Sequence, residues 1–378
     1  MAKKKILFVS GTRADFGKLK SLILSVQKNK SFHCSIFVTG MHLLDKYGNT
    51  HTEIKKAGVK NIYKCINQNY LDKMDTILAK TILVFSDYIA HNKPDLIVVH
   101  GDRVEALAGA IVGSLNNVNV AHIEGGEVSG TIDESIRHAV TKLSNFHFVS
   151  NRLSFKRIKY LGEDNKKIFN IGSPDIDIIN SKSLPSIKEV LKRYKINFKD
   201  YAILIFHPVT TEIEKIQYQV SELIKALLKS KKNYVVIYPN NDAGANIIFK
   251  EYEKIKKNKL FRFLPSMRFE YFLSLLKNAN FIIGNSSSAI KEAPYFGVPT
   301  INIGNRQHNR VYSKNIINTD FNIQKILSSI KLVDKKVVKK TKLFGKGKSA
   351  QLFMNILENN KIMWKTSTQK YFKDYKKK

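Results

Sequence analysis

Short apolar runs alternate with amphipathic stretches through the first 174 residues of the chain. The apolar runs predict strands at residues 5–10, 34–40, 95–101, 118–124, 147–150 and 168–174. The stretches between them carry hydrophobic side chains at helical spacing, for example over residues 16–27, 72–91, 104–115 and 134–143. Continuous apolar strands that alternate with helices are typical of a parallel sheet covered on both faces. The pattern therefore predicts a doubly wound α/β domain over residues 1–172.

A second series of the same kind follows a less regular stretch. Residues 173–200 mix Pro, Ser, Asn and Asp without clear periodicity, and we predict a linker there. New apolar runs occupy residues 201–209, 233–240, 260–266, 280–287 and 299–304. They predict a second Rossmann-like domain over 201–360, followed by a C-terminal helix over 361–378 that packs back on the N-terminal domain. Ligands of open α/β sheets bind outside the carboxyl ends of the strands, so we expect the two domains to face a central cleft.

The composition narrows the class of protein. The 378 residues include 64 Lys+Arg and 31 Asp+Glu, which gives a formal net charge of +33. Such a charge suggests a nucleic-acid partner, but the lysines are scattered along the predicted helices and no zinc-finger, basic-zipper or RNA-recognition pattern accompanies them. No apolar run approaches the roughly 20 residues of a membrane span, and Cys34 and Cys65 lack metal or disulfide spacing. We expect a cytoplasmic protein with no nucleic-acid and no membrane partner.

Acidic residues gather in one segment of this basic chain, between His100 and His138. The segment contains HGDRVEA, HIEGGE and TIDESIRH, and its acids are Asp102, Glu124, Glu127, Asp133 and Glu134. Asp102 and Glu124 each follow an apolar run, so we expect them at strand ends, where carboxylates can transfer protons. Helix caps and surface acids are the plain alternative, and the H-x-D and H-x-E spacings also suit a metallohydrolase site. His207 ends another apolar run and is either a core histidine or part of the site.

Two predicted turns have the features of phosphate sites. In VSGTRADFGK, Arg13 stands where a strand passes into a helix, although the spacing matches neither a Walker A loop nor GxGxxG. In IIGNSSSAIKEAP, Ser286 to Ser288 precede a predicted helix and can present N–H groups to a diphosphate, while Glu292 can accept hydrogen bonds from ribose. An ordinary serine cap with a surface Glu292 is the alternative. The two turns together favour a nucleotide diphosphate ligand.

Longer motifs point to a known family. The chain resembles the hydrolysing UDP-N-acetylglucosamine 2-epimerases of bacterial sialic acid biosynthesis in HGDRVEALAGA, HIEGGEVSGTIDESIRH, FHPVTTE, YPNND, RFEYFL, GNSSSAIKEAP, GTRADFGK and VTGMHLL. The resemblance spans residues 5 to about 312. Non-hydrolysing epimerases carry a Glu-Ala-Gly-Leu-Arg type of sequence where this chain has Glu124-Gly125-Gly126-Glu127. The hydrolysing branch is therefore favoured.

The resemblance implies a fold and a reaction. The fold is the two-domain glycosyltransferase-B type, with no metal and no nicotinamide cofactor. The reaction converts UDP-N-acetylglucosamine (UDP-GlcNAc) and water to N-acetylmannosamine and UDP, through elimination of UDP to a glycal and hydration with inversion at C2. A UDP-2,4-diacetamido-trideoxyglucose is the alternative substrate. The partners implied are the UDP-sugar and further copies of the chain, as a homodimer or a dimer of dimers.

The resemblance also assigns roles residue by residue. The catalytic groups that it implies are Asp102, Glu124, Asp133 and His207, the last beside the leaving phosphate. The residues that it implies for binding the UDP-sugar are Arg13, Arg103, Arg137, His138, Ser286, Ser287, Glu292 and Arg306. Glu127 and Glu134 are left as structural acids. Lys291 stands where relatives have arginine, which keeps the charge and loses the bidentate fork.

Overall fold

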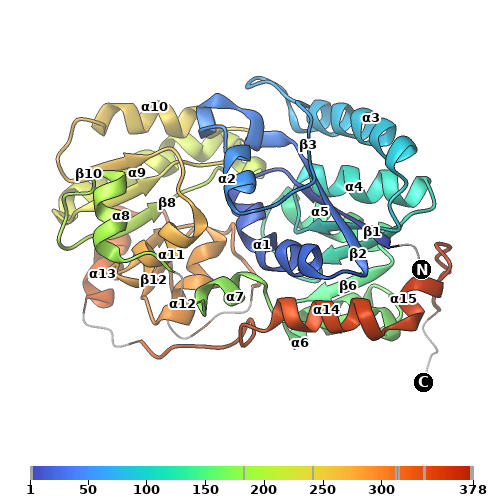
Figure 1. Ribbon diagram of the computed structural model, residues 1–378. Helices are drawn as coiled ribbons and strands as arrows, with labels where there is room; N and C mark the ends of the chain where they lie inside the picture. The colour runs from blue at the N-terminus through green and yellow to red at the C-terminus, as the bar shows by residue number, and fades with distance from the viewer. Residues whose placement is uncertain are drawn as a thin grey trace. The chain divides into compact units, whose positions relative to one another are not determined.

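The chain folds into two compact units, each built on one parallel sheet. The computed structural model describes residues 3–181, 184–240, 242–310, 313, 316–334 and 338–374. Unit 1 comprises Met1–Glu127, Asp133–Asn180 and Leu343–Lys378, and unit 2 comprises Val128–Ile132 and Ser181–Lys342. The elements of both units are labelled in Figure 1.

Unit 1 is a seven-stranded sheet in the order β3-β2-β1-β4-β5-β6-β7, with all of its pairings parallel. Its strands are β1 Lys4–Ser10, β2 Phe32–Val38, β3 Ile62–Lys64, β4 Leu96–His100, β5 Asn119–Ile123, β6 Phe146–Val149 and β7 Ile168–Asn170. Successive side chains of a strand point to opposite faces. Ile6 and Phe8 accordingly enter one hydrophobic cluster, and Leu7 and Val9 enter another. Both faces of this sheet are buried, as predicted.

The helices of unit 1 cover the two faces of that sheet (Figure 1). They are α1 Arg13–Lys28, α2 His51–Lys56, α3 Met74–Asn92, α4 Val104–Leu115, α5 Ile132–Leu143, α6 Arg152–Tyr160, α7 Asp175–Ile179, α14 Ser349–Asn359 and α15 Lys361–Lys365, with short 3₁₀ turns η1 Gly40–Leu43, η2 Asp45–Tyr47 and η3 Asn165–Lys167. Thr12 begins α1 because its hydroxyl accepts the Asp15 amide at 3.1 Å. Within the described residues, no helix combines the length and the apolar character that crossing a bilayer requires.

Unit 2 repeats the design with six parallel strands in the order β10-β9-β8-β11-β12-β13. Its strands are β8 Ala202–Ile205, β9 Tyr234–Ile237, β10 Phe261–Leu264, β11 Ile282–Gly284, β12 Thr300–Ile303 and β13 Ile316–Thr319. Its helices are α8 Ile187–Tyr194, α9 Ile216–Ser230, α10 Ala245–Ile255, α11 Phe269–Lys277, α12 Glu292–Phe296 and α13 Ile323–Val333, with 3₁₀ turns η4 Thr210–Lys215 and η5 Ser287–Ala289. The prediction of two doubly wound parallel α/β domains is confirmed.

The C-terminal part of the chain differs from the expectation in two ways. Residues from Leu343 onward belong to unit 1 rather than to a second domain that runs to 360, and α14 packs on α1. Phe353 of α14 also packs against the sheet of unit 1, since the centroid of its ring lies 4.7 Å from that of Phe148 on β6. The helix expected over 361–378 ends at Lys365, and residues 366–374 follow without helical structure, while 375–378 lie outside the described residues. The stretch predicted as a linker, 173–200, contains the helices α7 and α8.

Candidate active site

In each unit the strand order reverses between two neighbouring strands. The reversal lies between β1 and β4 in unit 1 and between β8 and β11 in unit 2. The carboxyl ends of strands at such a point border the ligand crevice of doubly wound sheets. The segments that follow these four strands begin at Gly11, Gly101, Phe206 and Asn285. The motifs GTRADFGK, HGDRVEA, FHPVTTE and GNSSSAIKEAP therefore lie where each sheet by itself favours a ligand.

His100 joins two carboxylates across the reversal point of unit 1. Its Nδ1 lies 2.8 Å from Oδ1 of Asp15, and its Nε2 lies 3.2 Å from Oε2 of Glu124. Glu124 also accepts a hydrogen bond from the Ser173 hydroxyl. Burial disfavours the charged imidazole, but the hydrogen bonds to Asp15 and Glu124 outweigh it and raise the pKa of His100 above its ordinary value. The charged form donates from both nitrogens, as two carboxylate acceptors require.

Glu124 lies in an uncommon backbone conformation at the end of β5. Its φ is 63°, in the left-handed region that favours glycine, and its side chain is buried. Its amide donates to the Phe148 carbonyl at 2.8 Å, which ties the turn to β6. Such backbone conformations cluster at functional sites, where the surrounding structure holds them in place. Here the turn brings the carboxylate to His100.

Asp102 has a different partner from Glu124. It forms an ion pair with the guanidinium of Arg137, which is buried on α5 and also donates to the Glu127 carbonyl at 3.2 Å. The Asp102 side chain keeps 23% of its surface exposed, against 3% for Arg137. Asp133 lies in the first turn of α5, one turn before Arg137, and is buried. The structure thus brings Asp102 and Arg137 together.

The other two acids of the segment, Glu127 and Glu134, contact neighbouring side chains of unit 1. The carboxylate of Glu127 accepts hydrogen bonds from the Ser150 hydroxyl, from Asn151 at 2.9 Å and from Ser154 at 3.1 Å, which anchors the loop after β5 to α6. Glu134 lies 3.4 Å from His138 on the surface of α5, with about a third of each side chain exposed. His138, predicted to contact the UDP-sugar, therefore has Glu134 as a partner in this structure.

The histidine of the H-x-E spacing at the end of β5 serves the fold. His122 is fully buried, and its ring lies 2.8 Å from the Gly101 carbonyl through Nε2 and 3.1 Å from the Thr141 hydroxyl through Nδ1. Burial lowers the pKa of His122 to about 3, so its ring is neutral. In the part of the chain that the structure describes, no group of three or more His, Cys, Asp or Glu side chains is arranged to hold a metal ion.

Several buried residues of this site were not singled out from the sequence. Asp15 and Ser173 complete the His100–Glu124 cluster, and the signal for both was their place in the strand-end stretches GTRADFGK and IFNIGSP. Glu105 is the third, at 2% exposure on α4. A Cβ atom on Gly11 would lie 2.7 Å from the carboxyl carbon of Glu105. Glycine at that position therefore makes room for this carboxylate.

Two arginines stand at the same end of unit 1. Arg13 is the first residue of α1 and Arg103 is the N-cap of α4, and both are half-buried. The first turn of a helix presents backbone N–H groups and a partial positive charge. Both helices start at the strand-order reversal, so each arginine is suitably placed to contact an anion there.

His207 and Asn285 connect the ends of β8 and β11 in unit 2. The His207 amide donates to Oδ1 of Asn285 at 2.7 Å, and Nδ2 of Asn285 donates to the His207 carbonyl at 2.8 Å. The Asn240 amide, after β9, donates to Nδ1 of His207 at 3.1 Å. Because Nδ1 is an acceptor, the proton of the neutral ring is on Nε2. Three loops thus fix the orientation and the tautomer of this imidazole.

The serine motif does not lead straight into the helix that the sequence predicts after Ser288. Ser286 caps the 3₁₀ turn at Ser287, where its hydroxyl accepts the Ser288 amide at 3.3 Å, and α12 begins only at Glu292. Glu292 and Lys291 are buried, at 0% and 4% exposure. The alternative of a surface glutamate is therefore wrong.

Arg306 and its neighbours contact the loop after β11 and the segment Val128–Ile132. Arg306 donates to the Asn285 carbonyl at 3.3 Å through Nη1, and Gln307 donates to the same oxygen at 2.8 Å. The Arg306 carbonyl accepts the Gly130 amide at 3.1 Å, and Arg310 donates to the Val128 carbonyl at 2.7 Å. These contacts explain why residues Val128–Ile132 group with unit 2.

Comparison with known proteins gives these sites a context. The family profile described as UDP-N-acetylglucosamine 2-epimerase matches residues 24–358. The chain belongs to this family. It is 43% identical to a UDP-N-acetylglucosamine 2-epimerase of Neisseria meningitidis serogroup B over 375 residues, which cover 98% of this chain and 99% of that protein.

A second relative is named for a different nucleotide sugar, and a solved structure shows the same fold. The chain is 34% identical over 361 residues to a UDP-N,N'-diacetylbacillosamine 2-epimerase (hydrolyzing) of Legionella pneumophila, which cover 94% of this chain and 96% of that protein. The crystal structure of the Methanocaldococcus jannaschii UDP-GlcNAc 2-epimerase with UDP-GlcNAc and UDP superposes with a TM-score of 0.76 at 21% identity, over 94% of this chain and 99% of that one. The chain therefore has the same glycosyltransferase-B type of fold as a solved UDP-GlcNAc 2-epimerase.

Proposed function

We propose that this epimerase is of the hydrolysing type and converts UDP-GlcNAc and water to N-acetylmannosamine and UDP. The observation that carries the proposal is the pair of strand-end carboxylates in unit 1, Asp102 and Glu124, each with a different cationic neighbour. Inversion at C2 requires one group that removes a proton and another that returns it. The Glu124-Gly125-Gly126-Glu127 sequence and the hydrolysing activity in the name of the Legionella relative support the hydrolysing branch.

The chemistry explains why acids are needed at all. The C2 proton of the sugar is not acidic in the ground state, because its substituents provide no enolate. As the bond from C1 to the UDP oxygen breaks, positive charge develops at C1 and acidifies the proton on C2. A carboxylate removes that proton and a glycal forms, and UDP leaves with the bonding electrons. Water then adds at C1 while a second acid protonates C2 from the opposite face.

We assign the proton transfers to Asp102, Glu124 and Asp133. Asp102 is paired with Arg137, and such an ion pair suits a carboxylate in the ionised form that a base needs. Glu124 is hydrogen-bonded to His100, whose charged form holds a proton that can be passed on. Asp133 lies one helical turn from Arg137. His207, with its proton on Nε2, would donate a hydrogen bond to the departing phosphate.

The loops after β8 and β11 of unit 2 would hold the UDP portion. The backbone turn at Ser286 and Ser287 presents N–H groups suited to phosphate oxygens, and Arg306 adds a cation beside Asn285. The buried carboxylate of Glu292 suits the two ribose hydroxyls. We propose Arg13 and Arg103 of unit 1 as further contacts for the anionic substrate, with Arg137 and His138 as less direct neighbours.

A second substrate has one observation in its favour. The Legionella relative, named for UDP-N,N'-diacetylbacillosamine, is 34% identical over almost the whole chain. The Neisseria relative, named for UDP-N-acetylglucosamine, is 43% identical over a greater share of both chains. We therefore propose UDP-GlcNAc as the substrate, with the released N-acetylmannosamine serving sialic acid biosynthesis.

The decisive experiment offers both donors to the purified protein in buffer with EDTA and identifies the products by NMR. We expect free N-acetylmannosamine and UDP from UDP-GlcNAc, with slower turnover of the 2,4-diacetamido donor. Formation of UDP-N-acetylmannosamine without release of UDP would contradict the hydrolysing type. Faster turnover of the diacetamido donor would reverse the substrate assignment, and loss of turnover in EDTA would favour metal-assisted hydrolysis.

A further inference from the structure

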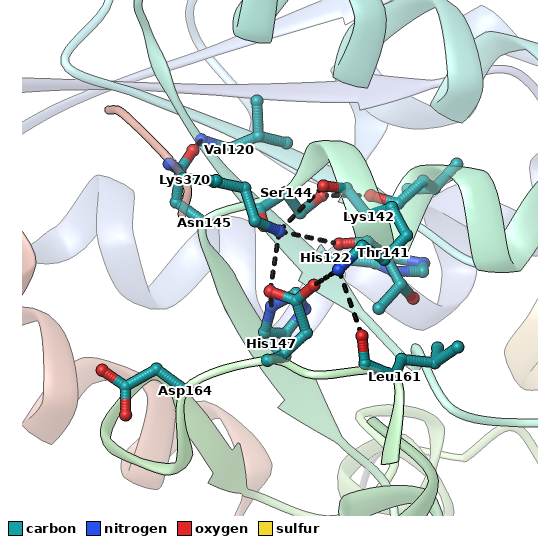
Figure 2. Close-up of polar contacts among 12 residues, drawn as sticks. Val120, His122, Thr141, Lys142, Ser144, Asn145, His147, Leu161, Asp164 and Lys370 are labelled. Carbon is teal, nitrogen blue, oxygen red and sulfur yellow. Dashed lines mark hydrogen bonds and ion pairs between the residues drawn. The ribbon is translucent and has the colours of Figure 1, made fainter. Parts of the chain in front are cut away.

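A buried polar cluster lies at the C-terminal end of α5, and the C-terminal segment of the chain supplies its central cation. The ammonium of Lys370 donates to the carbonyls of Lys142 at 2.8 Å and Ser144 at 2.6 Å, and lies 3.4 Å from that of Thr141. Figure 2 shows the Lys370 side chain directed at these groups. The last carbonyls of a helix have no partner within it, and a cation there also interacts favourably with the helix dipole. Lys370 thus caps the C-terminal end of α5, although it lies more than 220 residues later in the sequence.

The ammonium of Lys370 also forms an ion pair with a buried carboxylate. Glu163, at 4% exposure, lies 2.7 Å from Nζ of Lys370, 2.8 Å from Nζ of Lys142 and 3.1 Å from Nε2 of His147. Burial acts against the ionised form of Glu163, but the hydrogen bond from His147 and the two ammonium groups lower its pKa to about 2. The carboxylate is therefore ionised at any pH at which the protein would be assayed.

The cluster is connected to the turn that carries Asp102. The carbonyl of Thr141 faces Lys370, and its hydroxyl lies 3.1 Å from Nδ1 of His122. The His122 ring is neutral and its Nε2 donates to the Gly101 carbonyl at 2.8 Å, so Nδ1 accepts the proton of the Thr141 hydroxyl. Gly101, in a left-handed conformation with φ 69°, immediately precedes Asp102. Thr141 and His122 thus link the C-terminal segment, by hydrogen bonds at each step, to the turn before this carboxylate.

The N-terminal half of α5 contacts Asp102 directly. Arg137 forms the ion pair with Asp102, and Asp133 lies in the first turn. The position of α5 along its axis therefore affects both carboxylates at once. Reacting groups displaced by about 1 Å cost on the order of a hundredfold in rate, so the cap on α5 bears on the chemistry.

We propose that Lys370 is a positioning residue for the epimerase site. Docked between the last carbonyls of α5 and Glu163, it fixes that helix and the Gly101 turn, and so places Asp102 and Asp133 for proton transfer. This inference rests on the function proposed above. It assigns a role to the segment after α15, which also contacts the same region through the Thr368 carbonyl, where Asn145 donates at 3.2 Å.

The test compares Lys370→Met with Lys373→Met, a matched control at an exposed lysine of the same segment. We expect Lys370→Met to lower kcat about tenfold, equivalent to about 1.4 kcal/mol, with KM changed by less than about twofold because UDP binding is untouched. Lys370→Arg should recover most of the loss, since it keeps a cationic donor. The control should retain the wild-type kcat.

A second pair of variants removes the anion. Glu163→Gln should reproduce the loss in kcat, and the double variant with Lys370→Met should be no worse than either single change, because both act on one interaction. Asp164→Asn is its control, since Asp164 is exposed and its side chain points away from the cluster in Figure 2. Fully additive losses, or an equal loss in the Asp164 control, would overturn the proposal.

Amide hydrogen exchange gives a readout that does not depend on turnover. In the ligand-free Lys370→Met protein, amides of residues 133–143 and 101–103 should exchange faster than in the wild type and in Lys373→Met. Unchanged exchange together with wild-type kcat would overturn the positioning role. Absence of epimerase turnover in the wild type, with faster exchange in the variant, would contradict the proposed reaction and leave the docking of Lys370 on α5 established.

Discussion

The two strand-end acids of unit 1 differ in what their neighbours can supply. The guanidinium beside Asp102 does not release a proton in proteins, whereas the imidazolium beside Glu124 does so readily. An acid that returns a proton to C2 has to be reprotonated for the next turnover, and only Glu124 has such a neighbour among these contacts. We therefore expect Asp102 to remove the C2 proton and Glu124 to deliver the new one.

Paired variants separate these two roles. Both Asp102→Asn and Glu124→Gln should lower kcat by about a hundredfold or more, the usual range for loss of a proton-transfer group. Glu124→Gln should still remove the C2 proton and release the glycal and UDP, which NMR detects by the vinylic signal. Asp102→Asn should form neither product, and Glu134→Gln, on the surface of α5, should behave as the wild type. Glycal release by Asp102→Asn instead would reverse the assignment.

His100 gives the site a predictable pH dependence. Its pKa is raised in the folded protein, so the stability that it contributes is fully present below the ordinary value of 6.5 and is lost as the pH rises through the folded value. The difference in unfolding free energy between the wild type and His100→Gln should accordingly shrink above about pH 6.5. Urea denaturation at several pH values measures it, with the exposed His33→Gln as control. A difference that stays constant or grows with pH would show that His100 is not held as the imidazolium.

The sequence revealed the acids but not their partners. Asp102 and Glu124 were found because each follows an apolar run, which is a local signal. The pairing of Asp102 with Arg137, and of Glu124 with His100 and Ser173, joins residues that are 24 to 49 positions apart or lie on different elements. No periodicity encodes such contacts, so the protonation states that depend on them could not be predicted.

The end of β11 shows how one glycine shapes a binding element. Gly284 has φ 131°, and a Cβ atom there would overlap the carbonyl of Ile205 on β8. This close approach allows the Asn285 amide to donate to the Ile205 carbonyl at 3.1 Å, beside the bonds that fix His207. The absence of a side chain at Gly284 thus allows the ends of β8 and β11 to approach and brings Asn285 and His207 together.

Replacement of this glycine has a specific expected cost. Gly284→Ala should destabilise the protein by at least about 2 kcal/mol, because strain and overlap with backbone add. Gly58→Ala is the control, since its φ of 87° also lies in the region that favours glycine but no atom lies within 4 Å of the added Cβ, and it should cost about 1 kcal/mol. Chemical denaturation measures both. Equal losses would show that the contact with Ile205 is not responsible.

Element prediction succeeded where the apolar pattern was long and failed where it was short. The central strands are buried on both faces and appear in the sequence as continuous runs, and Leu96 to Val99 are examples. The edge strands β3 and β13 were not predicted, since β3 has three residues and both are partly exposed. The sequence of the tail has a helical pattern beyond Lys365, but the helix ends there. Contacts with distant residues, such as that of Lys370 with Ser144, cannot be predicted from the sequence.

Over the whole molecule, the formal charge of +33 understates how basic the surface is. Many of the scarce acids are buried, among them Glu105, Glu124, Glu163 and Glu292, while the lysines remain largely outside. A positive surface attracts anions over several ångströms and raises their rate of encounter. This suits a substrate that carries a diphosphate, and it requires no nucleic-acid partner.

The division into two doubly wound units was predictable, and one boundary was not. Each apolar series was long enough to form its own sheet. The amphipathic pattern of α14 shows that one face is buried but not which sheet it covers. The sequence therefore predicts a second domain that runs to 360, whereas unit 2 ends at Lys342. Phe353 against Phe148 decides the question through packing between distant residues.

The most direct test of the proposed reaction is the fate of the C2 hydrogen. The protein is incubated with UDP-GlcNAc in deuterated water, and the released sugar is examined by proton NMR and mass spectrometry. Elimination and hydration predict N-acetylmannosamine with one deuterium at C2, together with UDP. N-acetylmannosamine that retains the original hydrogen at C2 would contradict the removal and return of a proton by Asp102 and Glu124.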